Sequence, residues 1–266
     1  MPSFIDQMGR NNGLPQFPPR RIVSLVPSQT ELLFDLGLEN EVAGITKFCI
    51  HPPEWFQNKP RVGGTKTLNF NKIHALKPDL IIGNKEENER AQIETLAENY
   101  PVWMSDVRTL EDAYEMMRQI GALTGKSMEA DALLTGIRKQ FALLPDSGPL
   151  PSVAYLIWRK PYMAAAGDTF IQEMLHLAGF KNVFGHLARY PEISAEMLLA
   201  AKPDLLFLSS EPYPFSDKHI AEFQEICPQS RICIVDGELF SWYGSRLRLA
   251  PAYFLELRKT WAFAQP

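Results

Sequence analysis

The chain has 266 residues, 45% hydrophobic and 22% charged, so it can bury the core of one large domain or of two lobes of about 120 residues each. Its 27 basic and 31 acidic residues give a net charge of −4, which excludes a basic surface for nucleic acid. No apolar run approaches the roughly 18 residues needed to cross a bilayer.

The first twenty residues form a polar, proline-rich lead-in. They contain no basic segment followed by an apolar one, so no signal peptide is visible. If the sequence is complete, this predicts a cytoplasmic protein. The alternative is that a leader has been removed.

Strands and helices alternate through the first half of the chain. Short apolar, β-branched runs predict strands at residues 21–26, 41–48, 79–83 and 102–104, and helical patterns follow them at 30–37, 71–77, 89–99 and from 109 onward. We expect Ser28 and Glu31 to form a capping box and Asn71 to cap the second helix. An irregular loop is expected at 49–69. This alternation predicts a mainly parallel sheet with helices on both faces.

Residues 127–144 read as one long helix. Ser127 is its expected N-cap and Pro145 ends it. An apolar stripe at helical spacing is predicted at Ala130, Leu133 or Leu134, Ile137, Phe141 and Leu144. The helix would span roughly 27 Å. We interpret it as a stiff spine between two lobes, the alternative being an ordinary crossover helix in one larger domain.

The two sides of this helix resemble each other. The segment IHALKPDLIIG at 73–83 precedes it, and LLAAKPDLLFL at 198–208 follows it. The second half again alternates, with strands predicted at 152–158, 204–208 and 231–235 and helices at 170–179, 194–202, 219–226 and 251–262. We therefore predict an α/β fold of two Rossmann-like lobes with mainly parallel sheets, joined by one long backbone helix and separated by a cleft. The predicted parts are residues 1–126 for the N-terminal lobe, 127–145 for the backbone helix and 146–266 for the C-terminal lobe.

Ligands of open α/β sheets bind beyond the carboxyl ends of the strands. The loops there carry rings and cations together: Trp55, Trp103, Trp158, Tyr162, Tyr213, Phe215, Trp242, Tyr243, Arg159, Lys160, Arg246 and Arg248. Aromatic faces with a few cations suit a large planar or partly anionic ligand. For each ring, the alternative is a place in the core or at its rim.

Cys49 and His51 are the closest pair of metal-binding side chains in the sequence. Their Cys-x-His spacing at a strand end could present soft ligands to a metal ion, although two ligands do not complete a site. The alternative for Cys49 is a small buried apolar residue. The three cysteines indicate no disulfide framework. No nucleotide-binding, zinc-protease or serine-hydrolase motif is present, so we expect a protein that is not an enzyme.

Glu89 and Glu196 occupy corresponding places in the two halves, each at the start of a helix beside a KPDL strand. Carboxylates in the first turn of a helix are favoured by the helix dipole alone, which is one interpretation. The other is that they form a pair of docking residues.

Long segments of the sequence are similar to one family. They are RIVSLVPSQTELLFDLGL, ITKFCIHPPEWF, RVGGTKTLNFNKIHALKPDLIIG, WRKPYMAAAGDTFIQEMLHLAGFKNVF, PEISAEMLLAAKPDLLFL and VDGELFSWYGSRLRLAP. With the long helix, they resemble the substrate-binding proteins of iron-complex and vitamin B12 ABC importers, the helical-backbone metal receptors. The resemblance covers essentially residues 5–262.

The resemblance implies a cobalamin, ferric siderophore or haem held between two lobes. It also implies that Glu89 and Glu196 meet arginines of a membrane permease. The ligand-binding residues we expect are His51, Trp103, Trp158, Tyr162, Trp242, Tyr243 and Arg246, with Cys49 and His51 as possible metal ligands. His51 stands where the vitamin B12 binders have an aromatic residue, so the identity of the ligand stays open.

We therefore expect a monomeric binding protein without intrinsic cofactor that delivers a corrinoid, or otherwise a haem or ferric siderophore, to an ABC importer. The resemblance implies the periplasm or cell envelope as its location. Two alternatives stay open: a chelatase-like, tetrapyrrole-handling enzyme of the cytoplasm, and a cytoplasmic carrier without a transporter.

Overall fold

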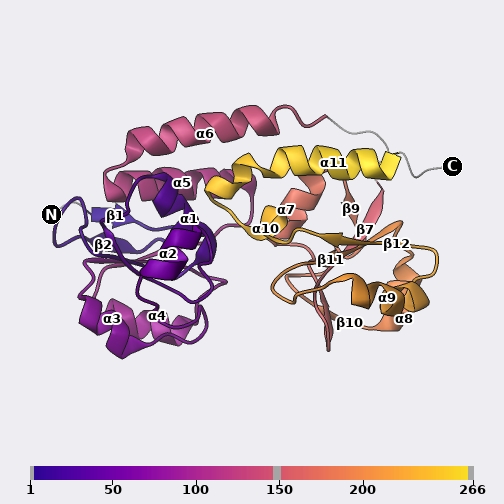
Figure 1. The fold of residues 1–266 in the computed structure, drawn as a ribbon, viewed down its shortest axis with the longest axis horizontal. Helices are drawn as coiled ribbons and strands as arrows, with labels where there is room; N and C mark the ends of the chain where they lie inside the picture. The colour runs from indigo at the N-terminus through magenta and orange to yellow at the C-terminus, as the bar shows by residue number, and fades with distance from the viewer. Residues whose placement is uncertain (1–2, 146–150, 263–266) are drawn as a thin grey trace. The chain divides into compact units, whose positions relative to one another are not determined.

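A computed structural model describes residues 3–145 and 151–262 (Figure 1). The described chain divides into two compact units: unit 1 is Met1–Val107, Glu111–Arg138 and Tyr243–Arg246, and unit 2 is Arg108–Leu110, Lys139–Trp242 and Leu247–Pro266. The boundaries predicted from the sequence remain a prediction, and residues 146–150 and 263–266 of the predicted C-terminal lobe lie outside the described residues. Within those described, no helix combines the length and apolar character needed to span a membrane.

Unit 1 contains a four-stranded parallel sheet in the order β4-β3-β5-β6. Its strands are β3 (Ile22–Ser24), β4 (Val42–Ile45), β5 (Leu80–Asn84) and β6 (Val102–Ser105). Nearly every strand residue is buried, as is typical of a parallel sheet covered on both faces. The four strands confirm the sequence prediction for this part of the chain.

Helices cover both faces of this sheet. The helices in this half of the chain are α1 (Pro27–Asp35), α2 (Pro53–Asn58), α3 (Phe70–Leu76), α4 (Arg90–Ala97), α5 (Leu110–Thr124) and α6 (Ser127–Phe141). On one face, Ile73 of α3 and Ile93 of α4 join the apolar core of the sheet. On the other face, Thr30 of α1 bonds to Ser24 of β3. Because successive side chains of a strand point to opposite faces of the sheet, the same strands can pack against helices on both faces.

The first two helices begin at other residues than the sequence predicts. α1 begins at Pro27 with Val26 as its N-cap and no side-chain cap, so the capping box expected from Ser28 and Glu31 is wrong. Proline suits the first helical position because its missing N–H would have no partner there. Asn69, rather than Asn71, caps α3 and accepts a hydrogen bond from the backbone N–H of Lys72. The expected irregular loop also contains α2.

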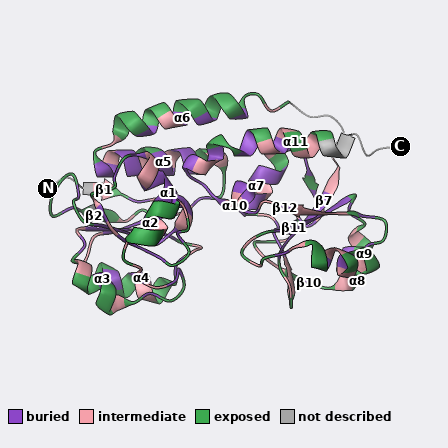
Figure 2. Cartoon of the chain, viewed as in Figure 1, coloured by how far each residue is buried: buried purple, intermediate pink, exposed green. Residues whose placement is uncertain are grey.

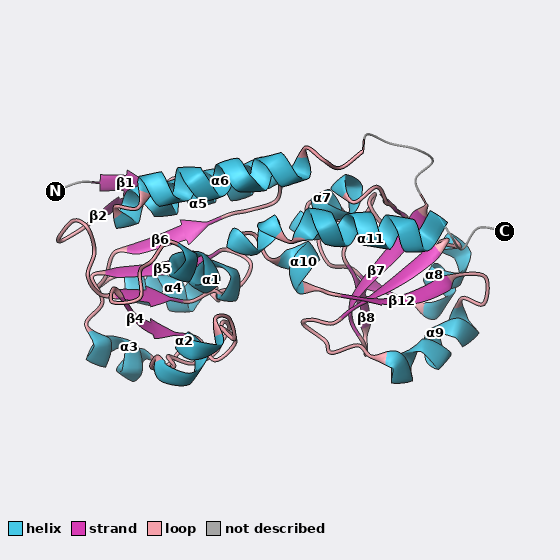
Figure 3. Cartoon of the chain, turned by 45° about the horizontal axis from the view of Figure 1, so that its top comes forward, coloured by secondary structure: helices cyan, strands magenta, loops and turns pink. Residues whose placement is uncertain are grey.

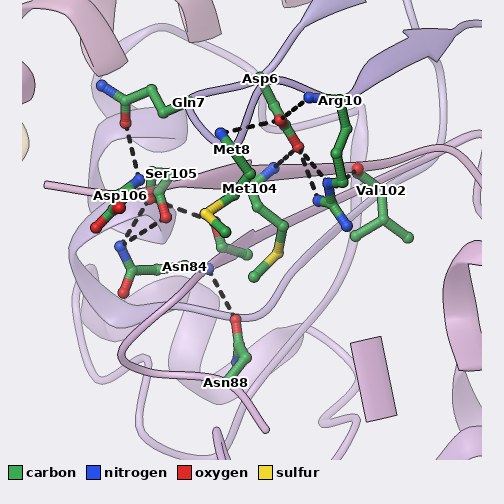
Figure 4. A network of polar contacts seen from close by, with 11 residues as sticks. Asp6, Gln7, Met8, Arg10, Asn84, Asn88, Val102, Met104, Ser105 and Asp106 are labelled. Carbon is green, nitrogen blue, oxygen red and sulfur yellow. Dashed lines mark hydrogen bonds and ion pairs between the residues drawn. The ribbon is translucent and has the colours of Figure 1, made fainter. Parts of the chain in front are cut away.

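The N-terminal lead-in folds as an antiparallel hairpin of β1 (Ser3–Ile5) and β2 (Asn11–Gly13), which the sequence analysis missed. Figure 4 shows how Asp6 holds it to β6. The buried Asp6 carboxylate accepts backbone N–H bonds from Met8, Arg10 and Met104 and pairs with the Arg10 guanidinium. Gln7 adds a hydrogen bond from the Asp106 backbone to its side-chain oxygen. The lead-in is therefore part of unit 1.

α5 and α6 lie side by side and antiparallel (Figures 1 and 3). A Cβ on Gly121 of α5 would come within 2.5 Å of the Ala130 Cβ of α6, so glycine permits the close approach. At the other end, the Arg138 guanidinium lies 4.8 Å from the ring centre of Tyr114. The buried stripe of α6 is Ala130, Leu134, Ile137 and Phe141, and the rest of the helix is largely exposed (Figure 2). The predicted stripe is confirmed at these four positions, with Leu134 in the place left open between two leucines. The prediction for Leu144 is wrong, because the helix ends at Phe141 and Leu144 is only half-buried.

Unit 2 contains a mixed sheet in the order β10-β8-β7-β11-β12, with β9 paired to β7. Its strands are β7 (Ser152–Trp158), β8 (Tyr162–Ala164), β9 (Lys181–Asn182), β10 (Glu192–Ile193), β11 (Leu205–Ser209) and β12 (Arg231–Val235). β7, β11 and β12 are parallel and confirm the three predicted strands, whereas β8 and β10 are antiparallel additions.

The helices of unit 2 are α7 (Phe170–Leu177), α8 (Ala195–Ala201), α9 (Ile220–Ile226), α10 (Glu238–Ser241) and α11 (Ala250–Ala262), with a short 3-10 turn at Asp217–His219. A second 3-10 turn, Ser245–Arg248, begins in the segment that belongs to unit 1. Thr169 and Ser194 cap α7 and α8 through hydrogen bonds from the backbone N–H groups of Gln172 and Met197. A cluster of rings packs on one sheet face, with Phe207 at 5.0 Å from Phe180 and 6.2 Å from Phe240.

Candidate ligand-binding site

Buried polar side chains line the carboxyl ends of β3, β5 and β6 in unit 1. The Gln29 amide donates to the Ser105 hydroxyl at 2.6 Å, and Asn84 donates to the same hydroxyl at 2.9 Å. All three residues are at most 1% exposed. Bonds made by buried side chains fix the strand ends, and with them the loops that a ligand would contact.

The Cys49 side chain has no exposed surface and lies just beyond β4. The hydroxyls of Thr30 and Thr46 each lie 3.1 Å from its sulfur. Burial raises the pKa of this thiol and outweighs the opposing effect of the two hydroxyls, so the thiol stays protonated at neutral pH. Its burial and its two hydroxyl partners fit the interpretation of Cys49 as a small core residue.

His51 is half-buried and directly precedes α2, and Trp103 is fully buried in β6. Among the described residues, no group of three or more histidine, cysteine, aspartate or glutamate side chains is arranged to hold a metal ion. The structure does not add ligands to the pair Cys49 and His51. Metal binding by this pair and ligand contact by Trp103 remain predictions.

A pocket of about 490 Å³ lies in unit 1 between the loop after β4 and the start of α3. Its lining residues are Lys47, Gly63, Gly64, Thr67, Leu68, Asn69, Phe70 and Asn71. Gly63 has a φ of +111°, and a Cβ there would lie 2.4 Å from the Thr67 carbonyl oxygen, so this wall requires glycine. None of the ligand-binding residues predicted from the sequence lines this pocket.

Arg246 belongs to unit 1 through the segment Tyr243–Arg246, which packs on α1. Its guanidinium donates two hydrogen bonds of 2.8 Å to the Glu31 carboxylate. A Cβ on Gly244 would lie 2.8 Å from the Ser28 carbonyl oxygen, so the backbone is close to the first turn of α1. Tyr243 is 6% exposed, and the segment therefore contributes mainly packed and paired side chains.

A cluster of aromatic and charged side chains lies where β7 ends in unit 2. Trp158 is 39% exposed and its ring meets Tyr213 edge-to-face at 5.6 Å. The neighbouring Arg159 pairs with Glu222 at 2.7 Å, and the Tyr162 hydroxyl donates to the same carboxylate at 2.6 Å. Burial and the bond to Glu222 raise the pKa of Tyr162 to about 12. This cluster offers an exposed ring beside a fixed guanidinium.

Trp242 is 7% exposed, and its indole N–H donates to Glu211 at 2.8 Å. The Ser241 hydroxyl donates to the same carboxylate oxygen at 2.7 Å. These bonds tie the loop after β12 to the loop after β11. The part of Trp242 that remains exposed is therefore held in one orientation.

Both candidate docking glutamates are exposed. Glu89 is the N-cap residue of α4, and Glu196 lies in the first turn of α8. A hydrogen bond with Ser194 lowers the pKa of Glu196, so this carboxylate is charged at neutral pH. An exposed carboxylate in each unit is what a docking role requires.

The structure places Trp158 and Tyr162 on the paired strands β7 and β8 of unit 2. Trp242 also belongs to unit 2, whereas Cys49, His51, Trp103, Tyr243 and Arg246 belong to unit 1. Sequence reasoning missed Glu31, Glu211 and Glu222, the carboxylates that hold Arg246, Trp242 and Arg159. The place of Glu31 and Glu222 in the sequence could have indicated two of these carboxylates, because both residues lie in the early turns of helices that follow strands.

Residues 22–225 match the family described as periplasmic binding protein. Among curated relatives, a vitamin B12-binding protein of Pectobacterium carotovorum subsp. carotovorum (strain PC1) is 27% identical over 242 residues, which cover 87% of this chain and 86% of the relative. A vitamin B12-binding protein of Photorhabdus laumondii is 27% identical over 237 residues, covering 87% and 85%.

Solved structures share the fold. The periplasmic vitamin B12 binding protein of Vibrio cholerae superposes with a TM-score of 0.76 at 22% identity, covering 94% of this chain and all of the other. A periplasmic haem-binding protein of Roseiflexus sp. RS-1 gives a TM-score of 0.75 at 24% identity, covering 89% of this chain and 98% of the other. These likenesses confirm the predicted two-lobed α/β class.

Proposed function

The chain belongs to the periplasmic binding protein family, and we propose that it binds a metal-complexed macrocycle and delivers it to an ABC importer. A corrinoid is the first candidate, because the curated relatives described above are vitamin B12-binding proteins. Haem and ferric siderophores are the second, since haem binders share the fold. The ligand is cargo and no intrinsic cofactor is needed.

The observation that carries this proposal is the cluster after β7. A partly exposed tryptophan ring, a tyrosine ring in contact with it and an adjacent guanidinium form a surface suited to a flat, ring-shaped ligand with polar side groups. His51, Tyr162, Trp242, Tyr243 and Arg246 are further proposed contacts or supports of this ligand. Trp103 would act through packing beneath the loops, because it is fully buried.

Delivery would use Glu89 and Glu196 as exposed carboxylates that meet arginines of the permease. Charge complementarity of this kind steers association and sets the register of docking. Such a protein works as a monomer on the outer side of the cytoplasmic membrane. The family description of this chain and its relatives supports that location.

The comparisons give no support to a chelatase-like enzyme, since the family and its relatives are binding proteins. An enzyme of that kind would need an acid or base held at the ligand. His51 is the histidine that the sequence offered for this role, and it is half-buried shortly before α2.

The experiment is a titration of the full chain with cyanocobalamin, hemin and ferric siderophores, followed by tryptophan fluorescence and the visible spectrum of each ligand. We expect saturable, sub-micromolar binding of one of them. Absence of saturable binding of all three would contradict the proposed function.

A further inference from the structure

Both units hold an arginine near the carboxyl edge of their sheet with a glutamate from a helix that follows a strand. In unit 1, Glu31 of α1 holds Arg246. In unit 2, Glu222 of α9 holds Arg159. The same arrangement therefore occurs once in each half, and in each unit it lies near the sheet edge at which ligands of open α/β sheets bind.

The two pairs differ in how far they are removed from water, and both are at least partly buried. The side chains of Arg246 and Glu31 are each 12% exposed, and those of Arg159 and Glu222 are 27% and 26% exposed. Burial alone would raise the pKa of Glu222, but hydrogen bonds from Arg159 and Tyr162 outweigh it and hold the pKa below its ordinary value. Glu222 therefore stays charged and keeps its partner at neutral pH.

A guanidinium that is already paired is a poor receptor for an anionic ligand. Its charge is compensated, and an incoming carboxylate must approach the glutamate that holds it. Either the ligand displaces that glutamate, which leaves a half-buried carboxylate without its cation, or it is repelled. Neutral amide and hydroxyl groups meet no such penalty, because they carry no charge that the glutamate would repel.

We infer that Glu31 and Glu222 are specificity-determining residues, which compensate Arg246 and Arg159 and thereby favour a metal complex with neutral side groups over one with carboxylate or catecholate groups. This inference rests on the proposed function and narrows its substrate class. Neighbouring charges agree with it in unit 1, where Lys85 is also paired, with Asp106 at 2.6 Å. In unit 2, Lys160 adds a cation beside Glu222, and the loops after β11 and β12 add the carboxylates of Glu211 and Asp236.

The test compares cyanocobalamin, whose side groups are amides, with hemin, which carries two carboxylates. In the unaltered protein we expect cyanocobalamin to bind more tightly than hemin. Glu222→Gln and Glu31→Gln each remove one negative charge while keeping side-chain shape. Each should strengthen hemin binding by about fivefold to tenfold and change cyanocobalamin binding less than about twofold.

Matched controls remove a charge from exposed glutamates nearby. The control variants are Glu225→Gln and Glu39→Gln. Glu225 lies on the same helix as Glu222, Glu39 lies shortly after α1, and both are exposed. We expect neither to change the ratio of the two affinities. If a variant fails to fold, a salt titration of the unaltered protein serves as the test. If the arginines are compensated, the affinity for hemin should vary little with ionic strength.

Three results would overturn the inference while leaving the proposed function intact. They are tighter binding of hemin than of cyanocobalamin by the unaltered protein, hemin affinity unchanged in both glutamine variants, and hemin binding that weakens steeply with salt. If neither ligand nor any ferric siderophore binds, the proposed function itself fails.

Discussion

Arg246 donates a hydrogen bond of 2.8 Å to each carboxylate oxygen of Glu31, a residue 215 positions earlier in the chain. Two parallel N–H···O bonds are the strongest form of this pairing, and both side chains are largely removed from water. The pair fixes the segment Tyr243–Arg246 to α1 within unit 1, although the chain on both sides of that segment belongs to unit 2.

Arg246→Gln should therefore destabilise the protein by about 2–4 kcal/mol, because it leaves the Glu31 carboxylate buried without its cation. The free energy of unfolding from urea titration measures this. Arg248→Gln, which removes the same charge from an exposed residue, should cost less than about 0.5 kcal/mol. Equal effects of the two variants would show that the pair carries no special stability.

Asp6→Asn should weaken the attachment of the N-terminal hairpin to β6. The Asp6 carboxylate accepts backbone bonds at 3.0, 2.8 and 3.2 Å and pairs with Arg10 (Figure 4). An amide has one acceptor oxygen and no charge, so we expect a loss of about 1–3 kcal/mol. Hydrogen exchange of the hairpin amides should accelerate, while the exposed Glu98→Gln serves as control. Unchanged exchange in Asp6→Asn would contradict this account of the hairpin.

Trp158 and Trp103 should respond in opposite ways to alanine substitution. Trp158 is 39% exposed at the proposed ligand surface, so Trp158→Ala should weaken ligand binding about tenfold and change stability little. Trp103 has no exposed surface, so Trp103→Ala should cost about 3–5 kcal/mol of stability. Calorimetric titration and urea unfolding measure the two effects. Full ligand affinity in Trp158→Ala would remove this residue from the site.

Cys49 should resist alkylation in the folded protein, because its thiol is buried and burial raises its pKa. Cys233 is partly exposed and should react with iodoacetamide first. The raised pKa has a second consequence. The stability linked to the protonated thiol is fully present below the pKa of this thiol in the unfolded chain, and it is lost as pH rises through the raised pKa of the folded protein. Mass spectrometry of peptides from native labelling tests the order, and early labelling of Cys49 would contradict the burial argument.

Charge reversal at the docking residues should separate delivery from binding. Glu89→Lys and Glu196→Lys should each reduce association with the permease and uptake of the ligand, because lysine would face arginine. Ligand affinity should not change, since both residues are exposed on helices outside the cluster after β7. Glu98→Lys is the control. Uptake at full rate in the double variant would exclude a docking role.

The sequence predicted the elements whose signals are local. Ser194 and Thr169 cap helices as expected, since a hydroxyl before an apolar helical pattern needs only neighbouring backbone N–H groups. The buried stripe of α6 follows from spacing alone. The start of α1 was wrong because Pro27 at the first helical position competes with the capping box pattern. β9 and β10 were missed because strands of two residues carry no periodic signal.

The site was predictable only in part, for a physical reason. Residue type and place after a strand indicate which side chains can reach a ligand. Burial and partners depend on contacts across the fold, such as Glu31 with Arg246 or Glu222 with Arg159. The sequence suggested that these arginines offer a positive charge to a ligand. The structure shows that a glutamate already compensates the charge of each.

The measurement that tests the central claim most directly is equilibrium dialysis of the full chain against cyanocobalamin, followed by chemical analysis of the recovered ligand. The account predicts one saturable site per chain and a ligand recovered unchanged. Absence of saturable binding of every metal complex offered, or recovery of a chemically altered ligand, would contradict the claim that this chain is a binding protein for a metal-complexed macrocycle.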